Sequence, residues 1–122
     1  LFLVTLSFSC GKKGGSENVD TLIPDLSQSW KNINNTQNDD EYNFFPVSKG
    51  VASSSFDGNE TIDFGSVGQN TFSGSFQNSK INFTFTNGPQ KGTTYTGKIN
   101  GNSASATMTL TTPSGTITLQ RH

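Results

Sequence analysis

The chain has 122 residues, a formal net charge of −1 and ten Phe, with only 30% hydrophobic and 14% charged residues. The near-neutral charge provides no basic surface for nucleic acid, so we expect no nucleic-acid partner. Disordered chains combine low hydrophobicity with high charge and few aromatic residues, whereas this Phe content favours a folded domain of short strands. A single Cys leaves no disulfide framework.

The amino end carries an apolar run, LFLVTLSFS over residues 1–9, which stops at Cys10. A bilayer span needs about 20 apolar residues, whereas a short run that ends in small residues is typical of a cleaved secretory signal. With Leu6 and Ser9 before Cys10, the run resembles the lipobox of bacterial lipoproteins, in the looser form of Bacteroidetes-type bacteria. The resemblance implies cleavage before Cys10 and acylation of Cys10 with fatty chains such as palmitate, which would hold the protein on a membrane.

Two further expectations concern this end of the chain. No Met or basic segment precedes Leu1, which predicts that the sequence begins inside its own signal; the alternative is that residues 1–9 are a strand of a larger domain. Gly11 rather than Asp follows Cys10, which resembles sorting to the outer membrane. We therefore expect a lipid-anchored protein of the bacterial cell envelope, at the periplasmic face of the outer membrane.

Residues 10–26 are expected to form the lipidated end and a flexible linker, because the segment after Cys10 is rich in Gly, Lys and Ser and lacks periodicity. Within it, Asp20-Thr21-Leu22 resembles the Asp-Ser/Thr-aliphatic acceptor of O-glycosylation in Bacteroidetes-type bacteria. The resemblance implies a glycan on Thr21. A plain solvated linker is the alternative.

Alternation of apolar and polar residues dominates the rest of the chain and indicates strands that bury one face. It is clearest in residues 71–76, 80–85, 94–99 and 104–110. Residues that favour turns separate these segments at Asn78-Ser79, Asn87-Gly88-Pro89, Asn100-Gly101 and Pro113-Ser114-Gly115. None of the segments has the period of a helix.

Turn length fixes strand register, and a slip of one residue would move every apolar side chain to the other face. A two-residue turn at Asn78-Ser79 predicts the pairs Phe76–Ile81, Gly74–Phe83 and Phe72–Phe85. Turns at Asn100-Gly101 and Pro113-Ser114 predict the pairs Gly97–Ala104, Tyr95–Ala106, Leu110–Ile117, Met108–Leu119 and Ala106–Arg121. All three hairpins keep one apolar face.

The first half is less regular. A three-residue loop at residues 57–59 is expected to join a strand ending at Phe56 to one with Ile62 and Phe64, after strands around Trp30 and from Tyr42 to Val47. Consecutive hairpins of this kind describe an all-β, antiparallel up-and-down meander of about eight to nine strands over residues 27–122. Because closure removes exposed strand edges, we expect a small barrel or a strongly curled half-barrel.

This domain resembles the lipocalin-like, or calycin-type, lipoproteins of Bacteroidetes-type bacteria. The likeness depends on Trp30 in the first strand, on the meander spacing and on Arg121 in the last strand. It implies that Arg121 covers Trp30 through a cation–π contact and closes one end of the barrel. A second likeness, to transferrin-binding-protein-type surface lipoproteins, depends on residues 62–65, 72–74 and 99–102.

Catalytic and metal sites find little support in the residue types. His122, the only His, ends the chain, and an acylated Cys10 cannot be a nucleophile, so neither a Ser/His/Asp triad nor a Cys/His pair can form. We therefore expect no enzyme activity, no cofactor and no His or Cys metal site. Two weaker alternatives remain: calcium binding by residues 39–41, and a glycosidase-like carboxylate pair among Asp57, Glu60 and Asp63.

The barrel interior is the remaining candidate site. If the interior is open, its apolar face would bind a small hydrophobic ligand, lined by Phe64, Phe72, Phe76, Phe83, Phe85, Tyr95 and Met108. The alternative is that these side chains fill the interior. Two function classes follow: a monomeric, membrane-tethered binding module for a hydrophobic ligand or an envelope protein, and an accessory envelope protein with a filled core and no ligand.

Overall fold

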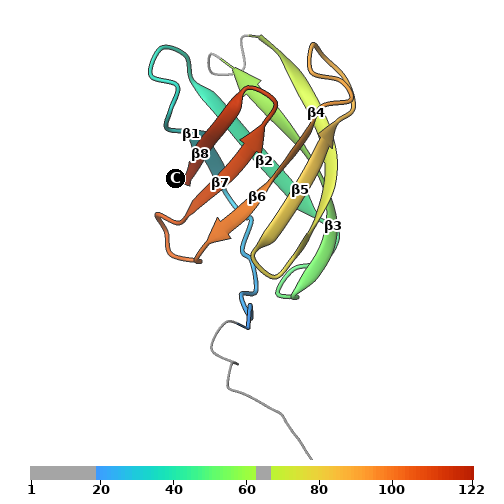
Figure 1. The fold of residues 1–122 in the computed structure, drawn as a ribbon, viewed down its shortest axis with the longest axis vertical. Coiled ribbons are helices and arrows are strands. Elements are labelled where there is room, and N and C mark those ends of the chain that lie inside the picture. Colours follow the sequence, from blue (N-terminus) through green and yellow to red (C-terminus); the bar gives the residue numbers. More distant parts are fainter. Residues whose placement is uncertain (1–18, 63–66) are drawn as a thin grey trace, which may run out of the picture.

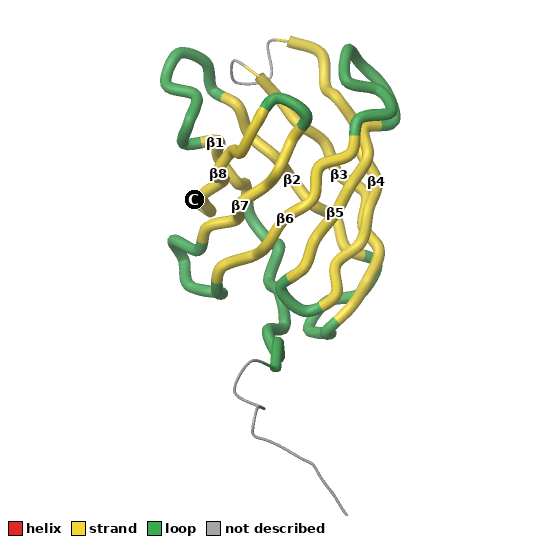
Figure 2. The backbone as a smooth tube through the Cα atoms, in the orientation of Figure 1, coloured by secondary structure: helices red, strands yellow, loops and turns green. Residues whose placement is uncertain are grey.

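The computed structural model describes residues 19–62 and 67–122. They form a closed barrel of eight antiparallel strands that follow one another in chain order (Figure 1). The strands are β1 (Ser29–Asn32), β2 (Asp40–Pro46), β3 (Ser53–Ile62), β4 (Val67–Gln77), β5 (Lys80–Phe85), β6 (Thr94–Asn100), β7 (Thr107–Thr112) and β8 (Gly115–Arg121). Figure 2 shows strands and loops but no helix in the described part of the chain. The predicted all-β meander is therefore confirmed.

Pairing of the first strand with the last decides between a barrel and a half-barrel. Trp30 of β1 lies opposite Arg121 of β8, and Asn32 lies opposite Leu119. Because this pairing closes the sheet on itself, neither β1 nor β8 is an exposed edge. The structure is the barrel rather than the half-barrel.

Two hairpins have the register that the turn residues predict. In β4–β5, Phe76 pairs with Ile81, Gly74 with Phe83 and Phe72 with Phe85, and Asn78 supplies the positive φ of 52° in the turn. In β7–β8, Leu110 pairs with Ile117 and Met108 with Leu119. The Arg121 amide also donates to the Ala106 carbonyl at 3.0 Å, as the predicted Ala106–Arg121 neighbours require.

The predicted register of β6–β7 is wrong. Gly97 pairs with Leu110 and Ile99 with Met108, because the connection is a loop over residues 101–106 rather than a two-residue turn. The shift from the predicted partner of Gly97, Ala104, to Leu110 is an even number of residues. An even shift preserves the face of each side chain, so the apolar residues still point inward.

The predicted loop at residues 57–59 is also wrong. These residues lie in the middle of β3, where Gly58 pairs with Phe44 on one side and Phe72 on the other. A side chain at Gly58 would collide with the Phe72 ring and the Asn43 carbonyl. The glycine is therefore required for close packing and not for a turn.

Aromatic side chains fill the centre of the barrel. Phe72 and Phe83 have ring centroids 4.4 Å apart, and Phe83 is also 5.5 Å from Tyr95 and 5.8 Å from Phe44. Such distances are those of rings in direct contact. The inward positions of successive strands thus form one core, with Trp30, Phe83, Met108, Leu110 and Leu119 wholly buried.

The barrel has two chemically different ends. The base is the end formed by loops 47–52, 78–79 and 101–106, where residues 19–28 lead into β1 (Figure 1). The far end is formed by loops 33–39, 86–93 and 113–114. Exposed apolar side chains lie mainly at the base, whereas buried polar side chains lie mainly at the far end.

Candidate functional site

Residues 19–28 cross the base and are fixed to it by hydrogen bonds. The Asn78 side chain donates to the Leu22 carbonyl at 3.0 Å, and the Asn102 side chain donates to the Ile23 carbonyl at 2.6 Å. Leu26 is part of the buried core. The part of the predicted linker from residue 20 to residue 26 is therefore attached to the barrel, and the folded body begins before the predicted boundary at residue 27.

Asp20 begins this attachment. Its carboxylate accepts hydrogen bonds from the Ser79 hydroxyl at 2.6 Å and the Ser79 amide at 2.9 Å. The Ser79 hydroxyl is the main cause of the lowered pKa of Asp20, and Lys98 adds a smaller electrostatic effect. Thr21, the predicted glycosylation position, is exposed beside it.

Arg121 closes the base from inside. Its guanidinium donates to the Asp25 carboxylate at 2.6 Å, to the Ser27 hydroxyl at 3.1 Å, and to the carbonyls of Asn102 and Ser103 at 3.2 Å each. Hydrogen bonds from Ser27 are the largest cause of the lowered pKa of Asp25, and Arg121 lowers it further. One buried cation thus joins three segments of the chain.

The Trp30–Arg121 pair lies where the family resemblance places it. The two residues are direct neighbours across β1 and β8, and both are buried. The Trp30 ring packs edge-on against Phe44, with centroids 6.4 Å apart. The polar contacts of Arg121 account for its role in closing the base, while the predicted cation–π contact stays a prediction.

An apolar groove of about 590 Å³ opens at the base, between residues 23–27 and the strand and loop around Phe44–Gly50. Its buried lining residues include Leu26, Phe44 and Phe76. Ile23, Phe45 and Lys49 line it with exposed side chains. The volume is in the range of pockets that hold small molecules.

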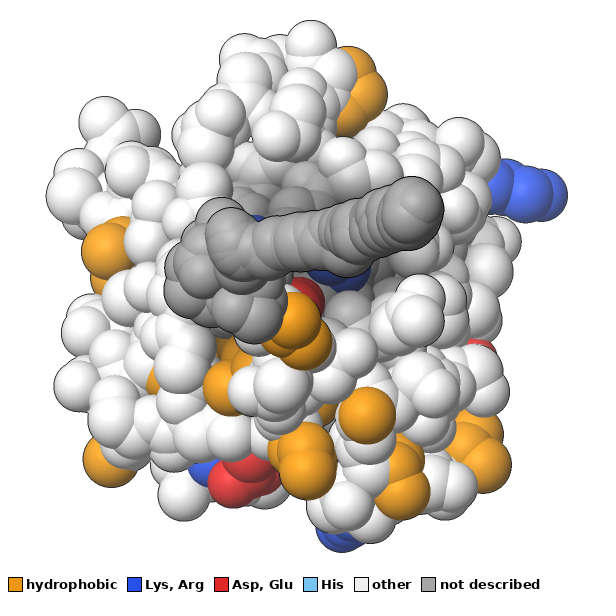
Figure 3. Space-filling view, turned by 60° about the horizontal axis from the view of Figure 1, so that its bottom comes forward, with side chains coloured by type: hydrophobic (Ala, Val, Ile, Leu, Met, Phe, Trp, Pro, Cys, Tyr) orange, Lys and Arg blue, Asp and Glu red, His pale blue; other side chains and the backbone are white. Residues whose placement is uncertain are grey.

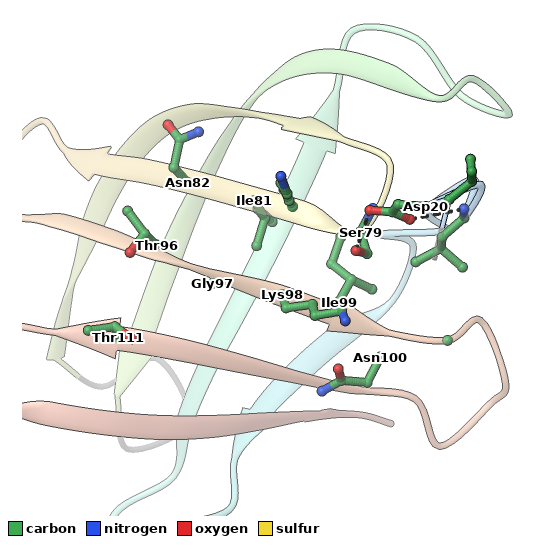
Figure 4. A pocket seen from close by; sticks show the side chains of 14 residues that line it. Asp20, Ser79, Ile81, Asn82, Thr96, Gly97, Lys98, Ile99, Asn100 and Thr111 are labelled. Carbon is green, nitrogen blue, oxygen red and sulfur yellow. Dashed lines mark hydrogen bonds between the residues drawn. The ribbon is translucent and has the colours of Figure 1, made fainter. Parts of the chain in front are cut away.

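A second hollow of about 1080 Å³ lies on the outer face of β5 and β6, next to residues 19–22. Figure 4 shows Asp20 bonded to Ser79 at one end of it, and Asn82, Thr96 and Thr111 along the strands. Its strand side chains are mostly polar and exposed. The hollow thus follows the outer face of the sheet, and its lining contains no aromatic side chain, unlike the groove, which has Phe44, Phe45 and Phe76.

Exposed apolar side chains gather at the base. Val19, Ile23, Phe45 and Val47 are 67%, 48%, 56% and 79% exposed, and among the described residues the other exposed large hydrophobic side chain is Ile33, at the far end. Figure 3 views the base and shows hydrophobic side chains together with charged side chains of both signs. Ile23 and Phe45 border the same groove, so this part of the apolar surface is contiguous, as at surfaces that contact another body.

The far end instead buries polar groups. Glu60 accepts a hydrogen bond from Asn70 at 3.2 Å, and Asp40 accepts one from Asn32 at 3.0 Å; all four residues are buried. Burial raises the pKa of Glu60 to about 8, and a hydrogen bond with Asp40 and the charge of Asp40 contribute. Glu60 therefore keeps its proton at neutral pH. Burial, and then the charge of Glu60, raises the pKa of Tyr42 as well.

The described residues support neither a calcium site at residues 39–41 nor an Asp57–Glu60 carboxylate pair. Asp57 points outward and accepts from Ser73 at 2.7 Å, whereas Glu60 points inward from the same strand, so they face opposite sides of the sheet. Asp63 lies outside the described residues. The carboxylates of residues 39–41 have three different partners: Asp39 pairs with Lys31 at 3.4 Å, Asp40 accepts from the buried Asn32, and Glu41 lies 3.3 Å from the His122 ring nitrogen.

In the described ranges, no three His, Cys, Asp or Glu side chains lie close enough together to hold a metal ion. The same ranges contain no helix long and apolar enough to cross a membrane. Neither observation identifies a function.

Six of the seven residues predicted to line a ligand site lie in the core, where their rings or side chains pack against one another: Phe72, Phe76, Phe83, Phe85, Tyr95 and Met108. Of these, Phe76 also borders the groove at the base. The seventh, Phe64, lies outside the described residues, as do Cys10 and the signal segment 1–9. The interior is therefore filled by these side chains, and the apolar groove lies at the base.

Sequence reasoning did not identify the residues that fasten the base, chiefly Asp25, Asn78 and Asn102. The sequence predicts Asn78 as a turn residue and nothing more, and it predicts a connection before β7 that is too short to include Asn102 as a loop residue. Pairs separated by more than 50 residues leave no local pattern, so only the closed fold brings them together. Comparison with protein families, with characterised proteins and with solved structures found no match to this chain.

Proposed function

We propose that this chain is a non-catalytic binding module of the bacterial cell envelope, anchored through acylated Cys10, that takes a small hydrophobic molecule in the groove at its base. The observation that carries the proposal is the apolar groove of about 590 Å³ with Leu26, Phe44 and Phe76 in its lining. The barrel interior is a poor alternative site because rings already occupy it.

The chemistry of the groove fits an acyl-chain-like ligand with a polar head. Its lining is mainly apolar, which favours a hydrocarbon portion. Lys49 at the opening supplies a positive charge for an acidic or polar head group. Residues 23–27 form one wall, so the groove lies beside the segment through which the chain enters the barrel.

The anchor is tested by the intact mass of the protein isolated from its source membranes. A diacylglycerol and an acyl group on Cys10, with residues 1–9 removed, are expected. The Cys10→Ser chain should remain unmodified and leave the membrane fraction. A wild-type protein of unmodified mass would contradict the anchor.

The groove is tested with the Cys10→Ser chain and a fluorescent long-chain fatty acid. Phe45→Glu should weaken binding about tenfold, because it removes apolar contact area and adds an anionic side chain at the opening. Ile33→Glu is the matched control, since Ile33 is similarly exposed at the far end. No saturable binding, or equal loss in both variants, would exclude the groove as the site.

A second candidate function is favoured by the packed interior. In this case the barrel is an accessory envelope protein that holds no ligand and interacts through its outer polar face. Native mass spectrometry of the protein extracted from source cells separates the two. A lipid-sized adduct supports the binding module, and a bare protein that also fails to bind the fatty acid supports the accessory function.

A further inference from the structure

The base of the barrel has the surface chemistry of a lipid-docking face. We propose that the base rests on the surface of a bilayer that contains anionic lipid, with Ile23, Phe45 and Val47 entering the interface and Lys49, Lys80 and Lys98 facing the head groups. This inference rests on the proposed anchor at Cys10, and it specifies how the anchored barrel is oriented.

The distribution of exposed apolar side chains is the first argument. Val19, Ile23, Phe45 and Val47 all lie at one end of the barrel, and each is about half exposed or more. Phe45 and Val47 come from the end of β2 and the loop that follows, whereas Val19 and Ile23 come from the segment that crosses the base. Apolar side chains from two separate segments therefore lie at the same end of the barrel, where Ile23 and Phe45 border one groove. Figure 3 shows hydrophobic groups at several places on this face.

The distribution of charge is the second argument. Lys49, Lys80 and Lys98 are exposed at the base, and Lys80 pairs with Lys98 in the β5–β6 register. The two carboxylates there are Asp20, which accepts from Ser79 and lies near Lys98, and Asp25, which pairs with Arg121. The base therefore presents three exposed lysines and Arg121 against two carboxylates. An excess of positive charge beside apolar side chains favours anionic membrane surfaces.

The far end has a different balance of charge. Its carboxylates Asp39, Asp40 and Glu41 face two lysines, Lys31 and Lys91, and Asp39 pairs with Lys31. Among the residues whose side chains are described, the exposed large hydrophobic side chain at this end is Ile33. An anionic surface would therefore attract the base more strongly than the far end.

The length of the chain before the barrel is the third argument. Nine peptide units separate Cys10 from Val19, and an extended chain spans about 30 Å over that length. The described chain leaves the barrel at the base. A lipid on Cys10 would therefore hold the base near the bilayer at high effective concentration, so weak contacts suffice for docking.

The test uses Cys10, the only Cys, to couple the full chain to a maleimide-bearing lipid in vesicles of phosphatidylcholine and phosphatidylglycerol. Coupling makes the result independent of natural acylation. Val47→Trp places a fluorescent side chain at the base, and Ile33→Trp is the matched variant at the far end. Trp30, buried in both, contributes the same background.

Docking predicts a blue shift of the Val47→Trp emission and its quenching by brominated lipid, with neither change for Ile33→Trp. Replacing Lys49, Lys80 and Lys98 by Glu should release the base, since each lysine near an anionic surface contributes about fivefold in binding. Higher salt should act in the same direction.

Equal quenching of both variants, or quenching of neither, would overturn the docking face. A blue shift that grows with protein density but is not quenched by brominated lipid would overturn it in favour of a second copy of the chain. If Cys10 carries no lipid in cells, the proposed anchor is wrong, but the vesicle experiment still tests the docking face, because the lipid is coupled chemically.

Discussion

The two ends of the barrel enclose their charged and polar side chains in different ways. At the base, the segment over residues 19–28 covers the opening, and Arg121 binds Asp25 across 96 positions of sequence. At the far end, the carboxyl groups of Asp40 and Glu60 are enclosed with Asn32 and Asn70. At the base, hydrogen bonds from Ser79 and Ser27 lower the pKa values of Asp20 and Asp25, so both carboxylates stay ionised. At the far end, burial raises the pKa of Glu60, which keeps its proton.

This difference teaches that strand alternation determines the middle of the barrel but not its ends. Inward positions in the middle are aromatic or aliphatic, and they pack against partners from neighbouring strands. At the far end, inward positions are polar and bond to one another, whereas at the base Arg121 is the buried charged residue and residues 25–27 cover it. Substitutions in the middle and at each end should therefore have different effects on stability.

The largest effect is expected in the shared middle. Phe83→Ala should lower the free energy of unfolding by about 3–5 kcal/mol, because Phe83 is fully buried and its ring contacts rings from β2, β3, β4, β5 and β6. Phe45→Ala, on an exposed side chain, should change it by less than about 0.5 kcal/mol. Urea unfolding measures both, and similar costs for the two variants would disprove a single aromatic core.

The next effect belongs to the far end and depends on pH. The pKa of Glu60 is raised to about 8 in the fold, so between its ordinary value and about 8 the unfolded chain loses a proton that the folded chain keeps. Stability should therefore fall as pH rises through this window and level off above it. Glu60→Gln, which cannot ionise, should remove this fall and be more stable than the parent at pH 9 by roughly 2–4 kcal/mol.

Urea unfolding at pH 5, 7 and 9 provides the measurement for Glu60. Asp57→Asn, on the outer face of the same strand, is the matched control and should keep the pH dependence of the parent chain. If Glu60→Gln retained the parent slope between pH 5 and pH 9, the buried, protonated carboxyl would have to be abandoned.

The sequence was sufficient for the parts of the fold that depend on local turns and alternation. The Asn78-Ser79 turn and its pairs Phe72–Phe85 and Phe76–Ile81 follow from a two-residue connection. The β6–β7 loop is longer than its Asn-Gly signal suggests, yet the faces survive because the shift is even. The loop predicted at Gly58 is wrong because the sequence does not distinguish a glycine that a turn requires from a glycine that lets a ring pack closely, as Phe72 does here.

The candidate site depends on information that alternation does not contain. The groove combines Leu26 and Phe44 with Phe76, which come from three separate segments. Burial of Glu60 likewise depends on how neighbouring strands are aligned in the closed barrel, and a local sequence pattern does not predict that alignment. Register within a hairpin is a property of its turn, whereas the composition of each barrel end is a property of all eight strands together.

A smaller effect is expected from the clamp at the base. Asp25→Ala should lower the free energy of unfolding by about 1–2 kcal/mol, since it leaves the buried Arg121 guanidinium without its charged partner while Ser27, Asn102 and Ser103 still accept from it. The half-exposed Asp25 carboxylate limits the loss. Asp57→Ala, an exposed carboxylate with one hydroxyl donor, should cost less than about 0.5 kcal/mol. Equal costs in urea unfolding would contradict the clamp.

The smallest effect is expected at Asp20, which attaches the first described residues to the barrel without contributing to the stability of the barrel itself. Asp20→Asn should leave the unfolding midpoint in place but speed hydrogen exchange of the Ser79 amide, because an amide side chain accepts less strongly than the carboxylate. In the parent chain the same protection should be present above the lowered pKa of Asp20 and lost as pH falls through it. The Ile99 amide, bonded to the Ser79 carbonyl at 2.7 Å, is the internal control and should exchange slowly in both chains. Faster exchange at both amides would mean that Asp20 supports the β5–β6 pairing itself rather than the segment that crosses the base.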